Sequence, residues 1–438
     1  MSHKSSHAQA GSGRDVAIVG AGIMGLSTAF YAAKAGHRVA VFEHDHVPGG
    51  MAAHFDFDGV SIERFYHFVC KADRTTFELM AELGIGDCMR WRPTSMGYFM
   101  DGRLSRWGDP ISLMRLPGLG LVDKLRYGLL AFTSTRRSDW THLDKLTAHT
   151  WIKSWVGPRA YEKLWRPLLH LKFFEHADNI SAAWIWTRLK RVGTSRRSLF
   201  QEELGYIDGG SETLVRALCE AITVRGGAIR LGAAVQEICV ADGAVTGVRT
   251  SQGLFPADRV ISTIPTPYVS KLVPALPEDW KRKYDSIPNI GVVCAMFRLK
   301  RSVSPHFWVN ISDPRIDIPG IIEFSHLRPL PDTVVCVPYY MPQTHSKWAR
   351  DDAFFVDEAF GYLRMINPAL RRDDIIATRV GRLRHAQPVC APRFLETIPE
   401  VVTPIKGLQI ADTCYYYPED RGISEGARLA KTMAGRVD

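Results

Sequence analysis

One stretch near the N-terminus decides the fold: VAIVGAGIMGLSTAFYAAKAGHRVAVFEHDHVPGG, residues Val16 to Gly50. It opens with 16–19, a short apolar run whose length and β-branched content are typical of a buried parallel strand. Three glycines follow this run at the spacing GxGxxG, namely Gly20, Gly22 and Gly25. Residues 23–35 are then predicted to form a helix. The stretch therefore predicts a strand, a tight glycine turn and a helix in direct succession.

Each glycine of the turn has a physical reason to lack a side chain. Gly20 lets the chain reverse tightly, Gly22 lets the backbone approach a pyrophosphate, and Gly25 lets the helix pack against the strand. Phosphates would bind the free N–H groups at the helix N-terminus, where the helix dipole favours anions. A second predicted strand, 38–42, ends at Glu43, which is the spacing of a carboxylate that accepts hydrogen bonds from an adenosine ribose. Together these features predict a dinucleotide site.

Length and composition indicate a globular protein of two intertwined domains. The chain has 438 residues, more than one hydrophobic core usually holds, and 46% of them are hydrophobic. Residues 1–13, MSHKSSHAQAGSG, are small and polar without the apolar centre of a signal peptide, so we expect a flexible lead. Since the sequence has no run of about twenty apolar residues, we expect no transmembrane span and a cytoplasmic location.

The cysteines and the net charge limit which metals, ligands and surfaces this protein is expected to bind. The eight cysteines lie far apart, without a CxxC pair or a Cys/His cluster at metal spacing, so we expect neither disulfides nor a metal site. The net charge is +9, with basic clusters at Arg136 and Arg137, at 188–198 and at 281–283. Such clusters either attract phosphates and anionic lipid or simply form a solvated surface. Because no nucleic-acid-binding motif is present, an anionic small substrate or a membrane surface is the better expectation.

A second glycine pair and the far end of the chain indicate which dinucleotide binds. Gly49 and Gly50 again let backbone approach a ligand, and the hairpin predicted around Asp58–Gly59 is an insertion that suits a flavin held in an extended pose. Near the C-terminus, a predicted strand ends at Asp412, where an acceptor can bind a ribityl hydroxyl. A helix that begins near Gly422 can point its N-terminus at an isoalloxazine, although the same pattern also suits a strand and helix that merely close the sheet. We therefore expect FAD, bound without a covalent link.

The motifs resemble those of the FAD-dependent amine oxidase, protoporphyrinogen oxidase and phytoene desaturase superfamily. The resemblance rests on GAGIMG with Glu43 and PGGM at one end, on YIDGGSETLVRAL and DRVISTIP in the middle, and on IADTCYYYPEDRGISEGARLAK at the other. It spans nearly the whole chain and is strongest to bacterial protoporphyrinogen-oxidase-like NAD(P)/FAD-dependent oxidoreductases. It implies an α/β fold in which a Rossmann-like FAD-binding domain, of the GR2 type of flavoprotein, is interleaved with an α+β substrate domain.

The architecture of this superfamily divides the chain into alternating segments. Its FAD-binding domain would take residues 14–70, 206–270 and 380–438, and its substrate domain residues 71–205 and 271–379. The first substrate segment is helical in pattern and rich in tryptophan, whereas the second contains strand-like runs separated by proline-rich turns.

The resemblance also assigns residues to the cofactor site. The superfamily commonly has Gly-Gly-Arg where this chain has Met51 in third place, which removes a cation near the phosphates, and Gly-Asp where this chain has Ala411-Asp412. Val235 falls where the superfamily contacts the adenine end through backbone. The residues expected to bind the cofactor are Gly20, Gly22, Gly25, Glu43, Gly49, Gly50, Met51, Val235, Asp412, Arg421, Gly422 and Ile423.

Three residues are candidates for the chemistry itself. Arg64 and His67 lie in ERFYHF, directly after the hairpin that the superfamily places beside the cofactor, or they simply occupy the outer face of a turn. Lys172 lies in the apolar stretch LLHLKFF, where a lysine either extends outward or is held inward for a function. We predict Arg64, His67 and Lys172 as catalytic residues, and Arg421 as a cation for a cofactor oxygen or an anionic substrate group.

Three functions fit this pattern. The favoured one is a FAD-dependent oxidoreductase that removes a hydride from a C–C or C–N bond of a small or lipid-like, optionally phosphorylated substrate. The alternative is a redox-neutral isomerase or mutase that acts on a nucleotide- or lipid-linked sugar, as the similar UDP-galactopyranose mutases do. A flavin-binding protein without catalytic activity is the least favoured of the three.

The segment 108–137 raises the question of a membrane. It mixes leucine, isoleucine, methionine and phenylalanine with five basic residues, and proline and charge interrupt it too often for a span. A basic amphipathic segment can instead lie in the plane of the bilayer interface, here at the inner face of the membrane. In the alternative interpretation it forms a helical pair whose leucines face the domain core. The sequence does not indicate an oligomeric state.

Overall fold

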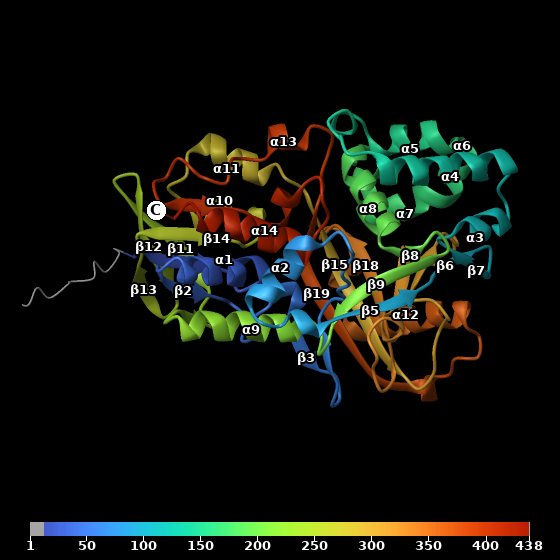
Figure 1. Ribbon diagram of the computed structural model, residues 1–438, viewed down its shortest axis with the longest axis horizontal. Helices are drawn as coiled ribbons and strands as arrows, with labels where there is room; N and C mark the ends of the chain where they lie inside the picture. Colours follow the sequence, from blue (N-terminus) through green and yellow to red (C-terminus); the bar gives the residue numbers. More distant parts are fainter. Residues whose placement is uncertain (1–12, 438) are drawn as a thin grey trace, which may run out of the picture.

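The structure is a computed structural model that describes residues 13–437. Residues 1–12 of the predicted flexible lead and Asp438 lie outside the described residues. Two parts, each built from several stretches of sequence, lie side by side: one surrounds a parallel sheet and the other a larger, mostly antiparallel sheet (Figure 1). The predicted α/β fold with a Rossmann-like part is confirmed.

The Rossmann-like part contains a five-stranded parallel sheet in the order β10-β2-β1-β14-β20. Its strands are Asp15–Val19 (β1), Arg38–Phe42 (β2), Ala228–Arg230 (β10), Arg259–Ser262 (β14) and Leu408–Ile410 (β20). β1 is central because its residues are apolar on both faces: Val16 and Ile18 pack on one side, and Ala17 and Val19 on the other. Strands from distant stretches of sequence thus form one sheet.

Helices cover one face of this sheet, and a small antiparallel sheet covers the other. The helices are Ile23–Lys34 (α1), Ser211–Val224 (α9) and Ile423–Ala434 (α14). On the opposite face lie Val235–Ala241 (β11), Ala244–Thr250 (β12), Gly253–Pro256 (β13), Val269–Leu272 (α10) and Glu278–Asp285 (α11). Turns at Asp242–Gly243 and around Gln252 join the three strands of the small sheet.

The second part is built on a seven-stranded sheet in the order β19-β15-β18-β17-β16-β6-β7. Its strands are Met96–Met100 (β6), Arg103–Trp107 (β7), Asn289–Leu299 (β15), Trp308–Ile311 (β16), Gly320–Glu323 (β17), Thr333–Met341 (β18) and Ile375–Pro388 (β19). The long strands β15, β18 and β19 pair antiparallel and supply apolar residues to three separate clusters of the core. Helix α12, Asp352–Ile366, packs against β15 and β19.

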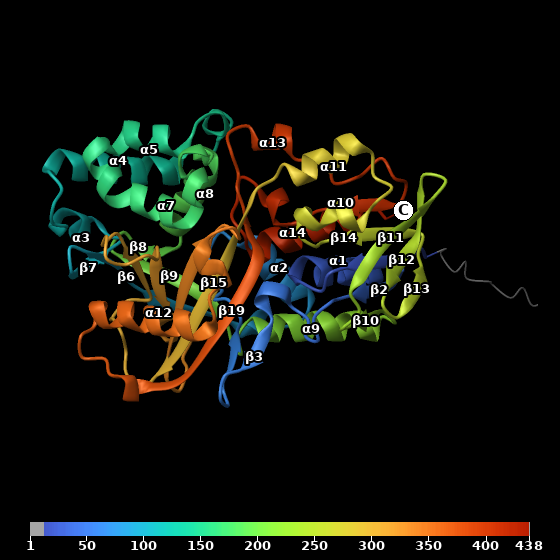
Figure 2. The same ribbon diagram turned by 180° about the vertical axis from the view of Figure 1, so that it is seen from behind.

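A group of helices packs against this sheet at the end of the molecule away from the C-terminus (Figure 2). They are Pro110–Arg115 (α3), Leu121–Arg136 (α4), Ala148–Val156 (α5), Pro158–Ala160 (α6), Arg166–Phe173 (α7) and Ala182–Thr194 (α8). Trp151, Trp184 and Trp186 are buried among them, which accounts for the tryptophan-rich sequence. Helix α7 contacts β18, so residues of the helical group come directly onto the sheet.

The first substrate segment contains more strands than its helical pattern predicts. Met89–Thr94 (β5), β6 and β7 precede the helices, and Arg196–Ser198 (β8) and Gln201–Ile207 (β9) follow them. β6 joins the large sheet by parallel pairing with the distant β16, a contact that local helical periodicity does not reveal. The predicted boundaries at 205 and 380 also cut β9 and β19, because both strands continue through them.

The predicted hairpin around Asp58–Gly59 is present. Its strands are His54–Asp56 (β3) and Ser61–Glu63 (β4), and the remaining helices are Arg74–Glu82 (α2) and Phe394–Thr397 (α13). All eight cysteines are free. Within residues 13–437, every helix is too short or too polar to cross a lipid bilayer.

Candidate active site

The two glycine motifs of the N-terminal segment lie against each other at the end of β1. Gly22 forms a bridge with Gly49, whose N–H donates to the carbonyl of Ala21 at 2.7 Å. A Cβ atom on Gly25 would lie 1.9 Å from the carbonyl oxygen of Gly20, so a side chain there would push α1 off the turn. In contrast, a Cβ atom on Gly22 would meet no atom within 4 Å. Gly22 therefore faces open space of the kind that a phosphate group can occupy.

Glu43 follows β2 directly, and hydrogen bonds fix its buried carboxylate. One oxygen accepts from the N–H of Ala21 at 2.7 Å and the other from the N–H of Asp45 at 2.9 Å. The ring of His44 lies 2.6 Å from the second oxygen. Burial raises the pKa of Glu43, but the hydrogen bonds from these three neighbours together outweigh burial and hold the pKa below its ordinary value. Glu43 is therefore an ionised acceptor beside the glycine turn.

The segment that leads into β11 lies beside Glu43. The N–H of Ala233 donates to the carbonyl of Glu43 at 2.7 Å, and Val235 begins β11 two residues later. Arg64 also comes to this end of the site, where it forms an ion pair with Asp45. We expected Arg64 beside the reacting groups, but the carboxylate of Asp45 holds its guanidinium at the Glu43 end instead.

A second helix N-terminus reaches the same region from the C-terminal end of the chain. Helix α14 begins after Gly422, and α1 begins after Gly22, in both cases without a side-chain cap. A Cβ atom on Gly426 would lie 3.7 Å from the backbone nitrogen of Met24. The two helices therefore pass each other at close range within the first turn of each, and α1 and α14 lie side by side in Figure 1. Their free N–H groups provide two neighbouring positive dipole ends.

Asp412 follows β20 and is almost completely buried. One of its carboxylate oxygens accepts from the N–H of Cys414 at 2.8 Å, and the other accepts from the N–H of Thr266 at 2.7 Å. Each oxygen retains a second lone pair for another donor. The two backbone bonds thus hold an acceptor in a fixed orientation at the end of the parallel sheet.

Arg421 lies directly before α14 and joins both parts of the molecule. Its guanidinium lies 3.9 Å from the sulfur of Met51, and it donates to the carbonyl of Ala386 in β19 and, at 3.5 Å, to the hydroxyl of Tyr340 in β18. Its Nε is buried and makes no hydrogen bond to the described residues. Met51 stands where the superfamily commonly has an arginine, and Arg421 brings a cation back to that position from the other end of the chain.

Aromatic and titratable side chains surround Tyr340. Burial raises the pKa of Tyr66 well above its ordinary value, and the hydrogen-bonded Tyr340 hydroxyl raises it further. Burial lowers the pKa of His67, so its imidazole is neutral near pH 7. The amine of Lys172 lies 5.1 Å from the centre of the Tyr340 ring and 4.9 Å from that of Trp184. The structure thus places Lys172 inward, beside residues of the large sheet.

Sequence reasoning missed four residues of this cluster: Trp184, Arg188, Tyr340 and Asp420. Arg188 forms an ion pair with Asp420 and lies 4.6 Å from the centre of the Trp184 ring. We interpreted 188–198 as a basic surface patch, but the spacing of four residues puts Arg188 on the same face of α8 as the buried Trp184. The four-residue spacing from Trp184 was the one signal in the sequence that could have identified Arg188 as part of this cluster.

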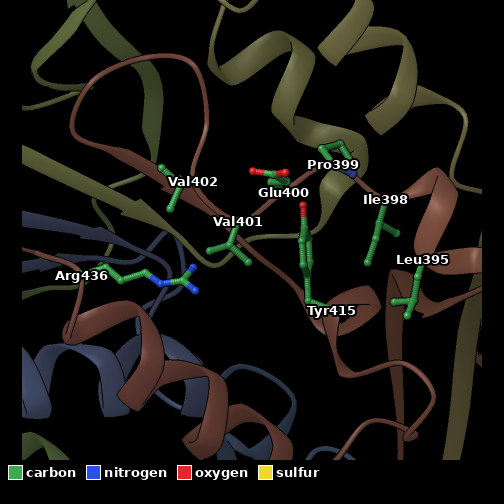
Figure 3. A pocket seen from close by; sticks show the side chains of 8 residues that line it. All are labelled: Leu395, Ile398, Pro399, Glu400, Val401, Val402, Tyr415 and Arg436. Carbon is green, nitrogen blue, oxygen red and sulfur yellow. The ribbon is translucent and has the colours of Figure 1, made fainter.

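A separate surface pocket of about 340 Å³ lies beside the chain between α13 and β20 (Figure 3). Glu400, Tyr415 and Arg436 bring polar groups to it, and aliphatic side chains complete its lining. None of the residues predicted for the cofactor or for catalysis lines this pocket.

Comparison with known proteins identifies the family. The family model of flavin-containing amine oxidoreductases matches residues 23–368, which is most of the chain. The chain belongs to this family. It is therefore a FAD-dependent oxidoreductase, as the sequence predicts.

Phytoene desaturases are among the proteins that this chain resembles in sequence. The chain is 27% identical to the 15-cis-phytoene desaturase of Synechococcus elongatus over 64% of each protein. It is 26% identical to a chloroplastic or chromoplastic 15-cis-phytoene desaturase of an Oncidium hybrid over 97% of this chain and 77% of that protein. The chain thus spans 64% of the length of the Synechococcus desaturase, and about half of the length of the tomato and pepper desaturases that it also matches.

Several solved structures share the fold. A protein from Exiguobacterium, provisionally assigned as a protoporphyrinogen oxidase, matches with a TM-score of 0.75 at 20% identity, over 97% of this chain and 98% of that one. Cyclohexylamine oxidase from Brevibacterium oxydans matches with a TM-score of 0.71 at 15% identity and the same coverage. Reduced UDP-galactopyranose mutase gives 0.73 at 15% identity, over 97% and 95% of the two chains. At these identities the matches establish the fold alone.

The residues of the site fit the cofactor of this family. Gly22 leaves open space beside an uncapped helix N-terminus, which suits a phosphate. Glu43 is an ionised acceptor one strand away, and Asp412 and the start of α14 offer an acceptor and free N–H groups at the other end. The site therefore has room for phosphates at the glycine turn, polar partners for a nucleoside on the Glu43 side and polar partners for a flavin on the Asp412 side.

Replacement of Glu43 tests its part in this site. Glu43→Gln keeps the shape of the side chain but removes the charge and turns an NH2 group toward one of two backbone N–H donors. We expect the FAD dissociation constant to rise roughly 10- to 100-fold, since hydrogen bonds to a charged group contribute about 1.5–3 kcal/mol. Titration of the apoprotein with FAD measures this constant. Glu237→Gln, an exposed carboxylate on β11, is the control and should bind like the wild type; equal affinity in all three proteins would contradict the assignment.

Proposed function

We propose that this flavoenzyme removes a hydride from a C–C or C–N bond of a small or lipid-like, optionally phosphorylated substrate. The observation that supports this proposal is the meeting of Arg421 with Met51 on the cofactor side and with Tyr340 on the substrate side. Aromatic rings dominate the substrate side, which suits an apolar substrate. We assign the cofactor side to the predicted FAD-binding segments and the substrate side to the predicted substrate segments, with each of the strands β9 and β19 kept whole.

We propose that three groups of residues bind the phosphates, the adenosine end and the flavin end of FAD. The backbone of the two glycine motifs and Met51 holds the phosphates, while Glu43 and Val235 hold the adenosine end. Asp412, Arg421, Gly422 and Ile423 hold the flavin end. When bound, FAD accepts the hydride.

The other residues of the site bind and orient the substrate. Tyr66 and Tyr340 pack at the junction of the two parts and exclude water from it. His67 is neutral, and its Nδ1 is buried without a hydrogen-bond partner among the described residues, so it is our candidate to accept a substrate proton. Lys172 contacts the substrate, whereas Arg64 acts at the Glu43 end and supports the cofactor.

A single experiment separates this function from the redox-neutral alternative. The FAD-loaded protein is mixed, without oxygen, with a panel of amines, isoprenoids and nucleotide-linked sugars, and the flavin absorbance is followed. We expect a substrate of the first two classes to bleach the oxidised flavin and to leave as an oxidised product. Conversion of a sugar only after chemical reduction of the flavin, with no net oxidation, would establish the mutase activity instead.

We also propose that helices α3 and α4 dock this protein on the inner face of the membrane from the cytoplasm. Most of the large apolar side chains that are strongly exposed among the described residues lie at this end of the molecule. On the two helices they are Ile111, Met114, Leu121, Val122, Leu125, Leu129 and Phe132. Val122 is 68% exposed and Leu125 60%, and Leu130 is the one leucine of α4 that is buried. Three of the four leucines of α4 are therefore exposed, whereas Leu116 and Leu119, which lie between the two helices, face the core as the alternative predicts.

A turn between β8 and β9 extends this apolar face. Leu199 and Phe200 are strongly exposed in the turn, and Arg196 ties the turn to the start of α3 by donating to the carbonyl of Gly108 at 3.0 Å. Exposed cations, Arg115, Arg136 and Arg197, accompany the apolar side chains. Apolar side chains flanked by cations match the interface of a bilayer that contains anionic lipid.

Flotation with vesicles tests the membrane contact. We expect the wild type to float with phosphatidylglycerol vesicles at low salt and to be released at high salt. Leu125→Asp combined with Leu129→Asp should lower binding more than tenfold, since burying a leucine contributes about 1.5–3 kcal/mol. Val224→Asp, a substitution of an apolar residue that is 85% exposed on α9, is the matched control and should float normally. A wild type that stays with the soluble fraction would refute the contact.

A further inference from the structure

Three cations lie together on the substrate side of the site. Lys172 comes from α7, Arg188 from α8 and Arg421 from the segment before α14. The Lys172 amine lies 4.9 Å from the centre of the Trp184 ring, and the Arg188 guanidinium lies 4.6 Å from the centre of the same ring. The rings of Phe173 and Tyr340 also face the amine. When Lys172 is protonated, two like charges therefore share one indole and repel each other, and a bound anion would relieve this repulsion.

The cluster carries more positive charge than its own carboxylates neutralise. Asp420 pairs with Arg188. Within residues 13–437, no carboxylate forms an ion pair with Lys172 or Arg421, and Lys172 donates no hydrogen bond. Burial lowers the pKa of Lys172 well below its ordinary value, and the charges of Arg188 and Arg421 lower it further. These effects favour the neutral amine, and an anion bound beside Lys172 and Arg188 would oppose them and hold Lys172 protonated.

The site expected for the phosphates of the cofactor does not include Lys172. The open space for phosphates lies at Gly22, beside the N-terminus of α1. The rings that face Lys172 come from α7, α8 and the large sheet, and Tyr340 contacts both Lys172, through its ring, and the Arg421 guanidinium, through its hydroxyl. An anion that binds beside Lys172 would therefore belong to the substrate. Lys172 also keeps part of its surface exposed, so a ligand can reach it.

We propose that Lys172 and Arg188 bind an anionic group of the substrate, a phosphate or a carboxylate. The rings of Phe173, Trp184 and Tyr340 pack against the apolar part of the substrate next to that group. The inference rests on the proposed function, because it names the substrate class of the same site. Anchoring one charged end leaves the apolar remainder of the substrate to extend along the aromatic side chains toward Arg421 and the cofactor side.

Ligand binding to the oxidised, FAD-loaded protein tests this anion site without turnover. The probes are octyl phosphate, octanoate and octanol, which share one chain length, and the readout is the change in flavin absorbance. We expect either charged probe to bind roughly 10- to 100-fold more tightly than octanol, since bonds to charged groups are the strong ones. The tighter of the two charged probes identifies the group as phosphate or carboxylate.

Two variants of Lys172 and one matched control make the test specific. Lys172→Met keeps the length of the side chain and should lose the preference for the charged probes, whereas Lys172→Arg should retain it. Lys190→Met is the control, because Lys190 also lies over a ring, that of Trp186 at 4.9 Å, but donates to the carbonyl of Arg137 outside the cluster. Equal binding of octanol by the wild type, or an unchanged preference in Lys172→Met, would overturn the proposal.

The same measurements keep this inference apart from the proposed function. If no compound of the panel reduces the flavin but the preference for charged probes persists, the oxidoreductase proposal fails and the anion site stands. If an uncharged substrate reduces the flavin and the preference is absent, the anion site fails and the oxidoreductase proposal stands.

Discussion

The close approach of α1 and α14 is the constraint on which the site depends. A side chain on Gly426 would press into Tyr416 and approach Met24 of α1, and a side chain on Gly25 would collide with the glycine turn that precedes α1. With both glycines in place, two helix N-termini without side-chain caps lie beside the end of one parallel sheet. Free N–H groups gathered in this way favour phosphate and electron-rich groups. The same packing that builds the core thus prepares the site for FAD.

The second part, which is built on the seven-stranded sheet, is held in place by polar contacts with the Rossmann-like part. Arg421 reaches Ala386 and Tyr340 in the large sheet. The buried carboxylate of Glu63 accepts from the N–H of Ser211 at 3.0 Å and pairs with Arg328 of the substrate part at 3.3 Å. Removal of one partner from such a buried pair leaves an uncompensated charge, so these contacts penalise other arrangements of the two parts. The position of Lys172 relative to the cofactor side therefore depends on both contacts.

The sequence predicted the fold from β1 to Glu43 well because its signals are local. The strand, glycine turn, helix and acid from β1 to Glu43 are fixed by residues adjacent in sequence, and the structure contains each of them. The cluster around Tyr340 was predicted less completely, because its residues meet only through the fold. Arg188 was interpreted as part of a basic surface, because its partner Asp420 lies far along the chain and the two meet only in the folded protein. The strand β6 was hidden for the same reason, since its pairing partner β16 is distant in sequence.

A crystal structure of the FAD-loaded protein tests the central claim most directly. The claim is that the paired helix N-termini hold FAD so that its flavin end meets the substrate part at Tyr340. We expect the phosphates to contact the backbone at Gly22 and Ile23, Glu43 to accept from the ribose, and the isoalloxazine to lie beside Gly422 on the side of Arg421 and Tyr340. Phosphates bound away from the glycine turn, or an isoalloxazine that contacts neither Gly422 nor Arg421, would contradict the account.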